Sequence, residues 1–292
     1  MAGAAVVACA LSPVASAQSS KHYTKQRGTT PVSHIANQRV STRATASSAL
    51  VWNGDLSTGT FSQYGMVQAC NGPSPVAGAT VVSSPVHPGF THSAALTVSD
   101  QSVTANCPQL GSYGHPNANI LSPGLFSPGN DDYVGFSTLF PASFPSNVCT
   151  PYVPGCWMQI MELYGPPYGG SAPVALDVWG NHLEMWTHNG TIWRAAQNIT
   201  KGTWQDIVVH VHFSTSATTG FVELWYQGVP QTFTNGKTRY YEATLQSGVN
   251  WNGRAANRVF LDQYRGANPA MGTVTLYSSG AKVGTTYASA AP

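Results

Sequence analysis

The sequence predicts an all-β protein, a sandwich or jelly roll of two antiparallel sheets. From residue 50 onward, short runs rich in Val, Tyr, Trp, Phe and Thr alternate with Gly, Pro and Asn. No stretch of roughly ten residues keeps a helical apolar stripe, so no helices alternate with the strands. The 29 Gly and 20 Pro suit the many close turns of such a fold.

The candidate strands follow one another along most of the chain. We predict strands at 94–98, 133–140, 157–164, 174–178, 182–188, 204–213, 221–226, 258–264 and 273–277. Asn189-Gly190 is typical of a two-residue hairpin turn, here between 185–187 and 192–194.

The charge content is low and unevenly distributed. Charged residues make up 8% of the chain, against about 25% in average proteins. Between Arg43 and Arg194 there is no Lys or Arg, but there are seven acids. The net charge of +2 gives no argument for a nucleic-acid partner. No apolar run reaches the roughly 18 residues of a membrane span, and we expect a monomer.

The N-terminal region has the composition of an exported protein. Residues 2–17 are small and apolar and end in Ala15-Ser16-Ala17, so we predict a secretory signal peptide over 1–17, although its basic n-region is missing. An Ala-rich tail is the alternative. Residues 18–48 are polar and basic, which predicts a disordered linker. We then expect a β-jelly-roll domain over 49–292 of a secreted, extracellular protein.

Four cysteines remain after the predicted signal peptide: Cys70, Cys107, Cys149 and Cys156. An even number in an exported chain suggests two disulfides, and three pairings are open. Cys149 and Cys156 bracket a short loop, which favours a local bridge and leaves Cys70 with Cys107. No C-x-x-C pair supports the alternative of a metal site.

Strand faces suggest a surface that binds sugars. Over 204–213, one face reads as core (Gln205, Ile207, Val209, Val211, Phe213), and the other carries Trp204, Asp206, Val208, His210 and His212. One face of 182–188 carries Glu184, Trp186 and His188. Because Trp stacks on sugar rings and ionisable groups bond hydroxyls, these faces together favour a glycan groove. The alternative is that they are ordinary sandwich residues.

Several motifs, taken in order, resemble one family. They are Tyr133-Val134-Gly135-Phe136-Ser137, Gly202-Thr203-Trp204-Gln205-Asp206, Gly220-Phe221-Val222-Glu223-Leu224-Trp225, Asp262-Gln263-Tyr264-Arg265 and Thr273-Val274-Thr275-Leu276-Tyr277. Across roughly 50–285 the chain resembles the heparin-lyase-I-like polysaccharide lyases. The resemblance implies a concanavalin-like jelly roll that binds an acidic polysaccharide on its concave sheet.

The resemblance also implies β-elimination on a uronic-acid polymer. That chemistry needs a neutraliser of the uronate carboxylate, a base for the C5 proton and an acid for the leaving O4. The matching positions suggest Gln159 as neutraliser, His210 as base, Tyr264 as acid or as both acid and base, and Arg265 as a substrate contact. The further substrate-binding candidates are Glu162, Tyr164, Trp186, His188 and His212. Two positions depart from the family, with Met161 in place of a His and Phe260 in place of a basic residue.

Two other functions stay open. The spacing of Trp157–Glu162 resembles the catalytic strand of laminarinase-type glycoside hydrolases, but only the last carboxylate, Glu162, is kept. In a regular strand Glu162 faces away from Gln159, so a β-bulge is needed to bring them together; Asp177 or Glu184 is then a candidate partner. The third function is a non-catalytic carbohydrate-binding module. We assign no catalytic metal and no certain cofactor, with a structural Ca²⁺ at Asp55 or Asp131-Asp132 as an option.

Overall fold

The computed structural model describes residues 49–70, 77–98, 117–150, 156–164, 172–214, 216–242, 245, 258–266 and 271–292. The predicted signal peptide, the predicted linker and Cys107 lie outside these residues. So do the side chains of Cys70 and Tyr164. In this part of the chain no helix has the length and apolarity needed to cross a membrane.

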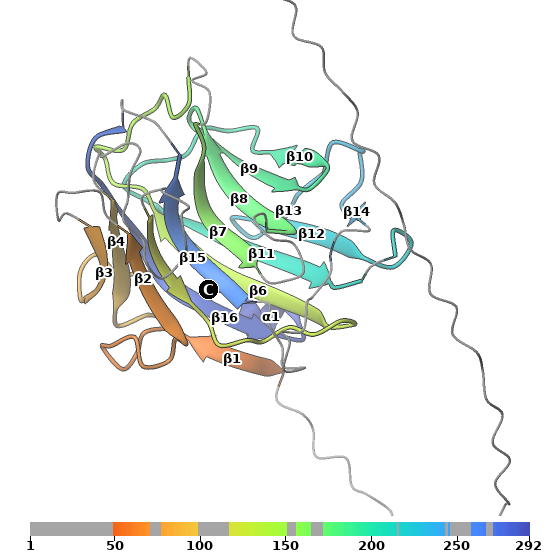
Figure 1. Ribbon diagram of the computed structural model, residues 1–292, viewed down its shortest axis with the longest axis horizontal. Coiled ribbons are helices and arrows are strands. Elements are labelled where there is room, and N and C mark those ends of the chain that lie inside the picture. Colours follow the sequence, from red (N-terminus) through yellow and green to blue (C-terminus); the bar gives the residue numbers. More distant parts are fainter. Residues whose placement is uncertain are drawn as a thin grey trace, which may run out of the picture. The chain divides into compact units, whose positions relative to one another are not determined.

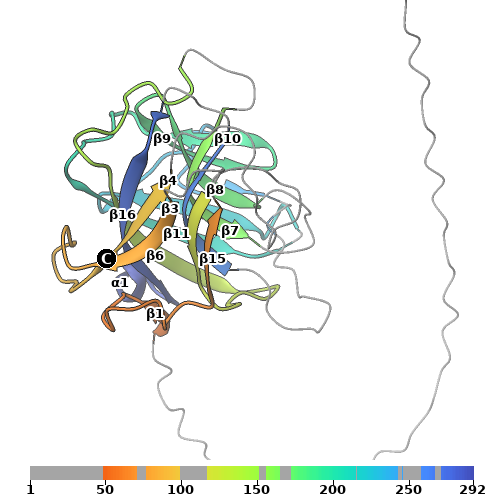
Figure 2. The same cartoon turned by 60° about the vertical axis from the view of Figure 1, so that its left-hand side comes forward.

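The described chain forms two antiparallel sheets (Figures 1 and 2). The nine-stranded sheet has the order β13 (Val229–Pro230), β12 (Phe221–Tyr226), β11 (Trp204–His212), β6 (Asp131–Leu139), β16 (Val274–Gly284), β4 (Ser93–Val98) and β3 (Ala77–Val82). In addition β1 (Leu50–Gly54) pairs with β16, and β14 (Tyr240–Tyr241) pairs with β12.

The seven-stranded sheet faces it. Its order is β10 (Gly190–Arg194), β9 (His182–Thr187), β8 (Val174–Trp179), β7 (Met158–Tyr164), β15 (Arg258–Arg265), β5 (Asn117–Leu121) and β2 (Met66–Cys70). The predicted all-β jelly roll is therefore confirmed. Every predicted strand is present, with the largest difference in β16, which continues to Gly284. The Asn189-Gly190 hairpin joins β9 to β10, with Gly190 at a φ of 101° that suits glycine.

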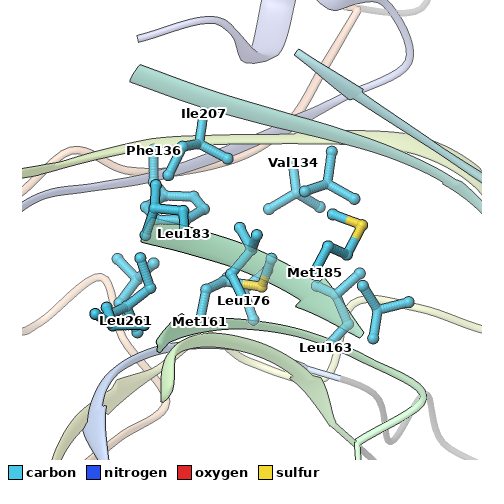
Figure 3. Packing of buried hydrophobic residues seen from close by; sticks show 14 of the residues in the cluster. Val134, Phe136, Met161, Leu163, Leu176, Leu183, Met185, Ile207 and Leu261 are labelled. Atoms are coloured by element: carbon cyan, nitrogen blue, oxygen red, sulfur yellow. The ribbon is translucent and has the colours of Figure 1, made fainter. Parts of the chain in front are cut away.

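The hydrophobic core fills the space between the two sheets (Figure 3). From the nine-stranded sheet, Val134, Phe136 and Ile207 point toward the seven-stranded sheet. That sheet contributes the labelled Met161, Leu163, Leu176, Leu183, Met185 and Leu261. Alternate residues of each strand enter the core, so the others form an outer face on each sheet. The core face predicted for 204–213 is confirmed.

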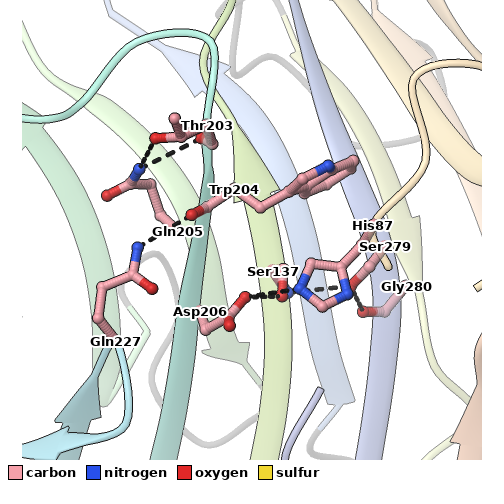
Figure 4. A network of polar contacts seen from close by, with 9 residues as sticks. All are labelled: His87, Ser137, Thr203, Trp204, Gln205, Asp206, Gln227, Ser279 and Gly280. Carbon is pink, nitrogen blue, oxygen red and sulfur yellow. Dashed lines mark hydrogen bonds and ion pairs between the residues drawn. The ribbon is translucent and has the colours of Figure 1, made fainter. Parts of the chain in front are cut away.

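The outer face of the nine-stranded sheet is occupied by other parts of the chain. The helix α1 (Tyr287–Ala290) packs against β16 and β6, and a Cβ on Gly135 would lie 2.0 Å from the carbonyl oxygen of Ala290. The segment before β4 reaches the same face (Figure 4). There His87 Nε2 lies 2.9 Å from Asp206 Oδ1, and Ser137 donates to the same oxygen. These contacts cover part of this face with other segments of the chain.

Candidate functional site

A polar row crosses the outer face of the seven-stranded sheet. Directly paired residues of antiparallel strands point to the same face, so the strand registers define the row. It runs across six neighbouring strands through Asn117, Tyr264, Gln159, Asp177, Glu184 and Arg194. Six strands span about 24 Å at the usual strand spacing. The row therefore offers a line of hydrogen-bonding groups across the strands.

A β-bulge in β7 adds Glu162 to this face. Gln159 pairs with Asp177, but Met161 pairs with Leu176, so the register between β7 and β8 shifts at Ile160. Ile160 and Met161 both turn into the core, and Glu162 returns to the outer face. A β-bulge is needed to place Gln159 and Glu162 on the same face of the sheet, and this bulge does so. It also places Met161 in the core, where it is fully buried.

Aromatic rings flank the polar row. Trp186 pairs with Ala175 and so lies on the same face as Asp177 and Glu184. At the other end, Trp157 meets the ring of Tyr264 edge-on, with centroids 4.4 Å apart. The carbonyl of Trp157 accepts a hydrogen bond from the Gly266 N–H, and the preceding residue is held by a disulfide, so its position is fixed on both sides. Rings beside hydrogen-bonding groups suit the apolar faces and hydroxyls of sugars.

The predicted Cys149–Cys156 disulfide is confirmed. It closes the segment that leads into β7 and immediately precedes Trp157. The predicted Cys70–Cys107 bridge lies outside the described residues and stays a prediction.

Three carboxyl groups, two of them buried and one partly buried, lie together on this face. We call Glu162, Asp177 and Asp262 the carboxyl cluster; they come from the adjacent strands β7, β8 and β15. Burial raises the pKa of Glu162 to about 7. Burial also raises the pKa of Asp262 well above its usual value, and the charges of Glu162 and Asp177 raise it further.

Asp177 lies on β8, beside the strand of Glu162. Burial raises its pKa well above the usual value, although side-chain hydrogen bonds from Trp186 and Gln159 act in the opposite direction. Negative charge on Glu162 or Glu184 raises it further. The described ion pairs give Glu184 a cation, Arg194, and give none to the cluster. Burial therefore disfavours the charged forms of all three carboxyl groups.

His210 does not lie with Gln159 and Tyr264, and the prediction that it does is wrong. It belongs to β11, and because Val209 and Val211 enter the core, His210 faces the outer side of the nine-stranded sheet. There its Nδ1 lies 2.6 Å from Glu223 Oε2 and its Nε2 lies 2.6 Å from Asp131 Oδ1. The ring also stacks on Tyr133. His210 is a structural residue in this arrangement.

His212 and Arg265 also lie away from the predicted site. His212 shares the outer face of the nine-stranded sheet, 3.8 Å from Asp131. Arg265 alternates with Tyr264 and turns inward, where it is 2% exposed. Its guanidinium donates to the carbonyl oxygens of Val98 and Gly272. Both substrate-contact predictions are therefore corrected.

The glycan surface predicted from strand faces is in fact two surfaces. Glu184, Trp186 and His188 belong to the seven-stranded sheet or its edge, whereas Trp204 and Trp225 belong to the nine-stranded sheet. Sequence reasoning also missed Asp262. The sequence feature that could have identified Asp262 is its position two residues before Tyr264, because alternate residues of a strand lie on the same face.

Two of the residues suggested as Ca²⁺ ligands, Asp55 and Asp131, are bonded to other side chains or backbone groups. Both oxygens of Asp55 accept hydrogen bonds from N–H groups, namely Asn53 Nδ2, Gln63 Nε2 and the Ser57 backbone. Asp131 is bonded to His210. Within the described ranges, no three His, Cys, Asp or Glu side chains are grouped so that they could hold a metal.

The protein is a jelly roll whose seven-stranded sheet carries a polar outer face flanked by aromatic rings. The sequence profile of the family described as "Polysaccharide lyase" matches residues 56–265. The chain belongs to this polysaccharide lyase family. No curated protein sequence matches it significantly.

Two solved structures show the same fold. An endo-β-1,4-glucuronan lyase from the fungus Trichoderma reesei is 16% identical, with a TM-score of 0.55 over 80% of this chain and 96% of that one. The catalytic domain of a glycoside hydrolase family 131 protein from Coprinopsis cinerea is 14% identical, with a TM-score of 0.55 over 84% of this chain and 98% of that one. At these identities the likeness shows the fold alone.

Proposed function

We propose that this protein cleaves a uronic-acid-containing polysaccharide by β-elimination, with the polymer lying along the polar row of the seven-stranded sheet. The observation that carries the proposal is the direct cross-strand pairing of Tyr264 and Gln159 on this outer face. These are two of the positions that match the lyase family. Family membership supports the reaction type, and the row supports the binding surface.

Tyr264 acts as both base and acid in this proposal. His210 is on the other sheet, and His182 and His188 belong to β9 or its end, three strands from β15. Three strand spacings amount to about 14 Å, too far to share a reacting carbon. If one residue takes the proton from C5 and gives a proton to O4, the C5 hydrogen and O4 must lie on the same side of the sugar ring. This arrangement occurs in 4-linked glucuronate and mannuronate.

Gln159 stabilises the developing negative charge. A carboxylate next to the breaking C–H bond disfavours the carbanion, and hydrogen bonds to that carboxylate stabilise the enolate-like transition state. The Gln159 amide has two N–H donors. One serves Asp177, which orients the amide and leaves the other for substrate. Arg194 at the exposed end of the row supplies a cation for a neighbouring sugar carboxylate.

A glycoside hydrolase is the second candidate, and Glu162 is the observation that favours it. A buried carboxyl group with a pKa of about 7 suits a general acid, and Asp177 lies close enough for its pKa to respond to Glu162. Hydrolysis with retention needs two carboxyl groups in such proximity. The lyase is preferred because the chain belongs to a polysaccharide lyase family.

Secretion and the finer family type belong to the same proposal. The disulfide and the small, apolar residues 2–17 support an extracellular protein. The ordered motifs support a heparin-lyase-I-like type, and the scarcity of Lys and Arg before Arg194 favours a substrate less charged than heparin.

A substrate panel tests the function. The purified protein is incubated with glucuronan, alginate, pectate, heparin and β-glucans. Ultraviolet absorbance of unsaturated uronate indicates a lyase, reducing ends without this absorbance indicate a hydrolase, and retention on the polymer without products indicates a binding module.

One substitution and its matched control test the role of Tyr264. Tyr264→Phe should lower the rate of unsaturated-product formation by about 100-fold or more. The matched control Tyr277→Phe removes the same hydroxyl from the nine-stranded sheet and should leave the rate unchanged. Full lyase activity in Tyr264→Phe would show that the acid–base assignment is wrong.

A further inference from the structure

The carboxyl cluster poses a problem for a site that takes a polyanion. A bound uronate adds a fourth carboxylate beside Glu162, Asp177 and Asp262. Like charges in a buried site repel one another unless a cation or a proton compensates. How the site accepts its substrate therefore depends on what neutralises these groups.

No described ion pair joins a cation to the cluster. Arg194 is bound to Glu184 on the far side of Asp177. Arg258 precedes Asp262 by four residues on β15, about 13 Å along a strand, and it pairs with Tyr164, which makes it a diagonal neighbour of Glu162 at about 7–8 Å. His182 on β9 contacts the Ala195 carbonyl. None of these described groups appears among the influences on the pKa of Glu162 or Asp262.

Asp262 shows that the cluster has free hydrogen-bonding capacity. It is 2% exposed, and neither of its carboxyl oxygens has a hydrogen-bond partner in the described structure. Oδ1 of Asp177 is likewise without a partner there. Buried polar atoms are normally satisfied, so these atoms point to a ligand that completes them. Their place beside Gln159 and Tyr264 puts that ligand on the polar row.

We propose that the protonated carboxyl groups of Glu162, Asp177 and Asp262 donate hydrogen bonds to the carboxylate of a uronate, in place of the Lys, Arg or His that such a site would otherwise use. The inference rests on the proposed function and adds the mode of substrate recognition. An O–H···O⁻ bond between a carboxyl group and a carboxylate is short and charge-assisted. Binding of the sugar carboxylate is then coupled to binding of a proton by the carboxyl groups.

This recognition selects uronates over other anions and over neutral sugars. A sugar carboxylate is a good acceptor for the hydrogen bond of a neutral carboxyl group. A sulfate ester is a much weaker base, so it gains less from the same donors. Neutral glucans leave the orphaned oxygens of Asp262 without a charged partner. The preferred ligand class is therefore an unsulfated polyuronate.

Proton-linked binding tests the inference. The Tyr264→Phe protein binds without cleaving and is titrated calorimetrically with a glucuronate oligosaccharide in buffers of different ionisation enthalpy. We expect about one proton to be taken up at pH 8, with the affinity falling about tenfold per pH unit above 7. In the background of Tyr264→Phe, Glu162→Gln should lower the proton uptake, because the amide donates an N–H without titrating. Glu223→Gln, on the nine-stranded sheet, should not change it.

The outcomes separate the inference from the proposed function. Binding without proton uptake, or affinity that rises with pH, overturns the inference. Equal affinity for a neutral β-glucan overturns it as well. If the wild-type protein forms no unsaturated product but binds glucuronate with proton uptake, the lyase proposal fails and the recognition by carboxyl groups stands.

Discussion

Glu162→Gln is expected to stabilise the protein at alkaline pH. Its side chain is buried on the outer face of the seven-stranded sheet, and burial raises its pKa from 4.5 to about 7. Between these pH values the folded protein holds a proton that the unfolded chain has released. The linkage relation then requires the free energy of unfolding to fall as the pH rises through this window.

The size of the effect follows from the pKa difference. Each pKa unit corresponds to about 1.4 kcal/mol, so ionising Glu162 in the folded state costs about 3 kcal/mol above pH 7. Below pH 4.5 the carboxyl group is protonated in both states and the cost disappears. Gln is neutral at every pH and has nearly the same shape, so Glu162→Gln should gain about 3 kcal/mol over the wild type at pH 8 and nothing at pH 4.

Urea unfolding at pH 4, 6 and 8 measures this difference. The control Glu223→Gln should be less stable than the wild type by about 2 kcal/mol, since Glu223 bonds both His210 and Arg239. A wild-type stability that is flat or rises between pH 5 and 8 relative to Glu162→Gln would refute the assignment of a proton to the buried cluster.

Three further substitutions test the placement of residues. His210→Gln should lower the free energy of unfolding by about 2 kcal/mol and leave kcat/KM unchanged, because His210 is on the other sheet; a large loss of kcat/KM would return it to the active site. Arg265→Ala should cost about 3 kcal/mol of stability, and an unchanged melting temperature would contradict its inward position. Gly135→Ala forces a Cβ into contact with Ala290 and should cost about 1–3 kcal/mol, measured by thermal unfolding, whereas no loss would place α1 elsewhere.

Strand positions were predictable from the sequence because they depend on local composition and turns. The assignment of each strand to a sheet was not. β6 lies in the nine-stranded sheet, β7 to β10 in the seven-stranded sheet, and β11 again in the nine-stranded sheet. Alternating aromatic and polar residues show that a strand has an outer face, but not on which sheet. The match of His210 to the family therefore could not show that His210 and Gln159 lie on different sheets.

From the sequence, the bulge in β7 was predictable only as something that a shared face would need. A shared face for Gln159 and Glu162 requires an extra residue, and the sequence Ile160-Met161, two apolar residues in succession, is consistent with it. The inward turn of Arg265 follows from alternation once Tyr264 is placed outward. The raised pKa of Asp262 was not predictable, since it depends on Glu162 and Asp177 from two other strands.

The masses of the products test the central claim most directly. A glucuronan or alginate digest by the wild-type protein is analysed by mass spectrometry beside the Tyr264→Phe digest. β-Elimination predicts oligosaccharides lighter by one water molecule than hydrolysis products, with an unsaturated uronate at the non-reducing end, and almost none from Tyr264→Phe. Products of the full hydrated mass, or equal amounts of unsaturated product from both proteins, would contradict the account.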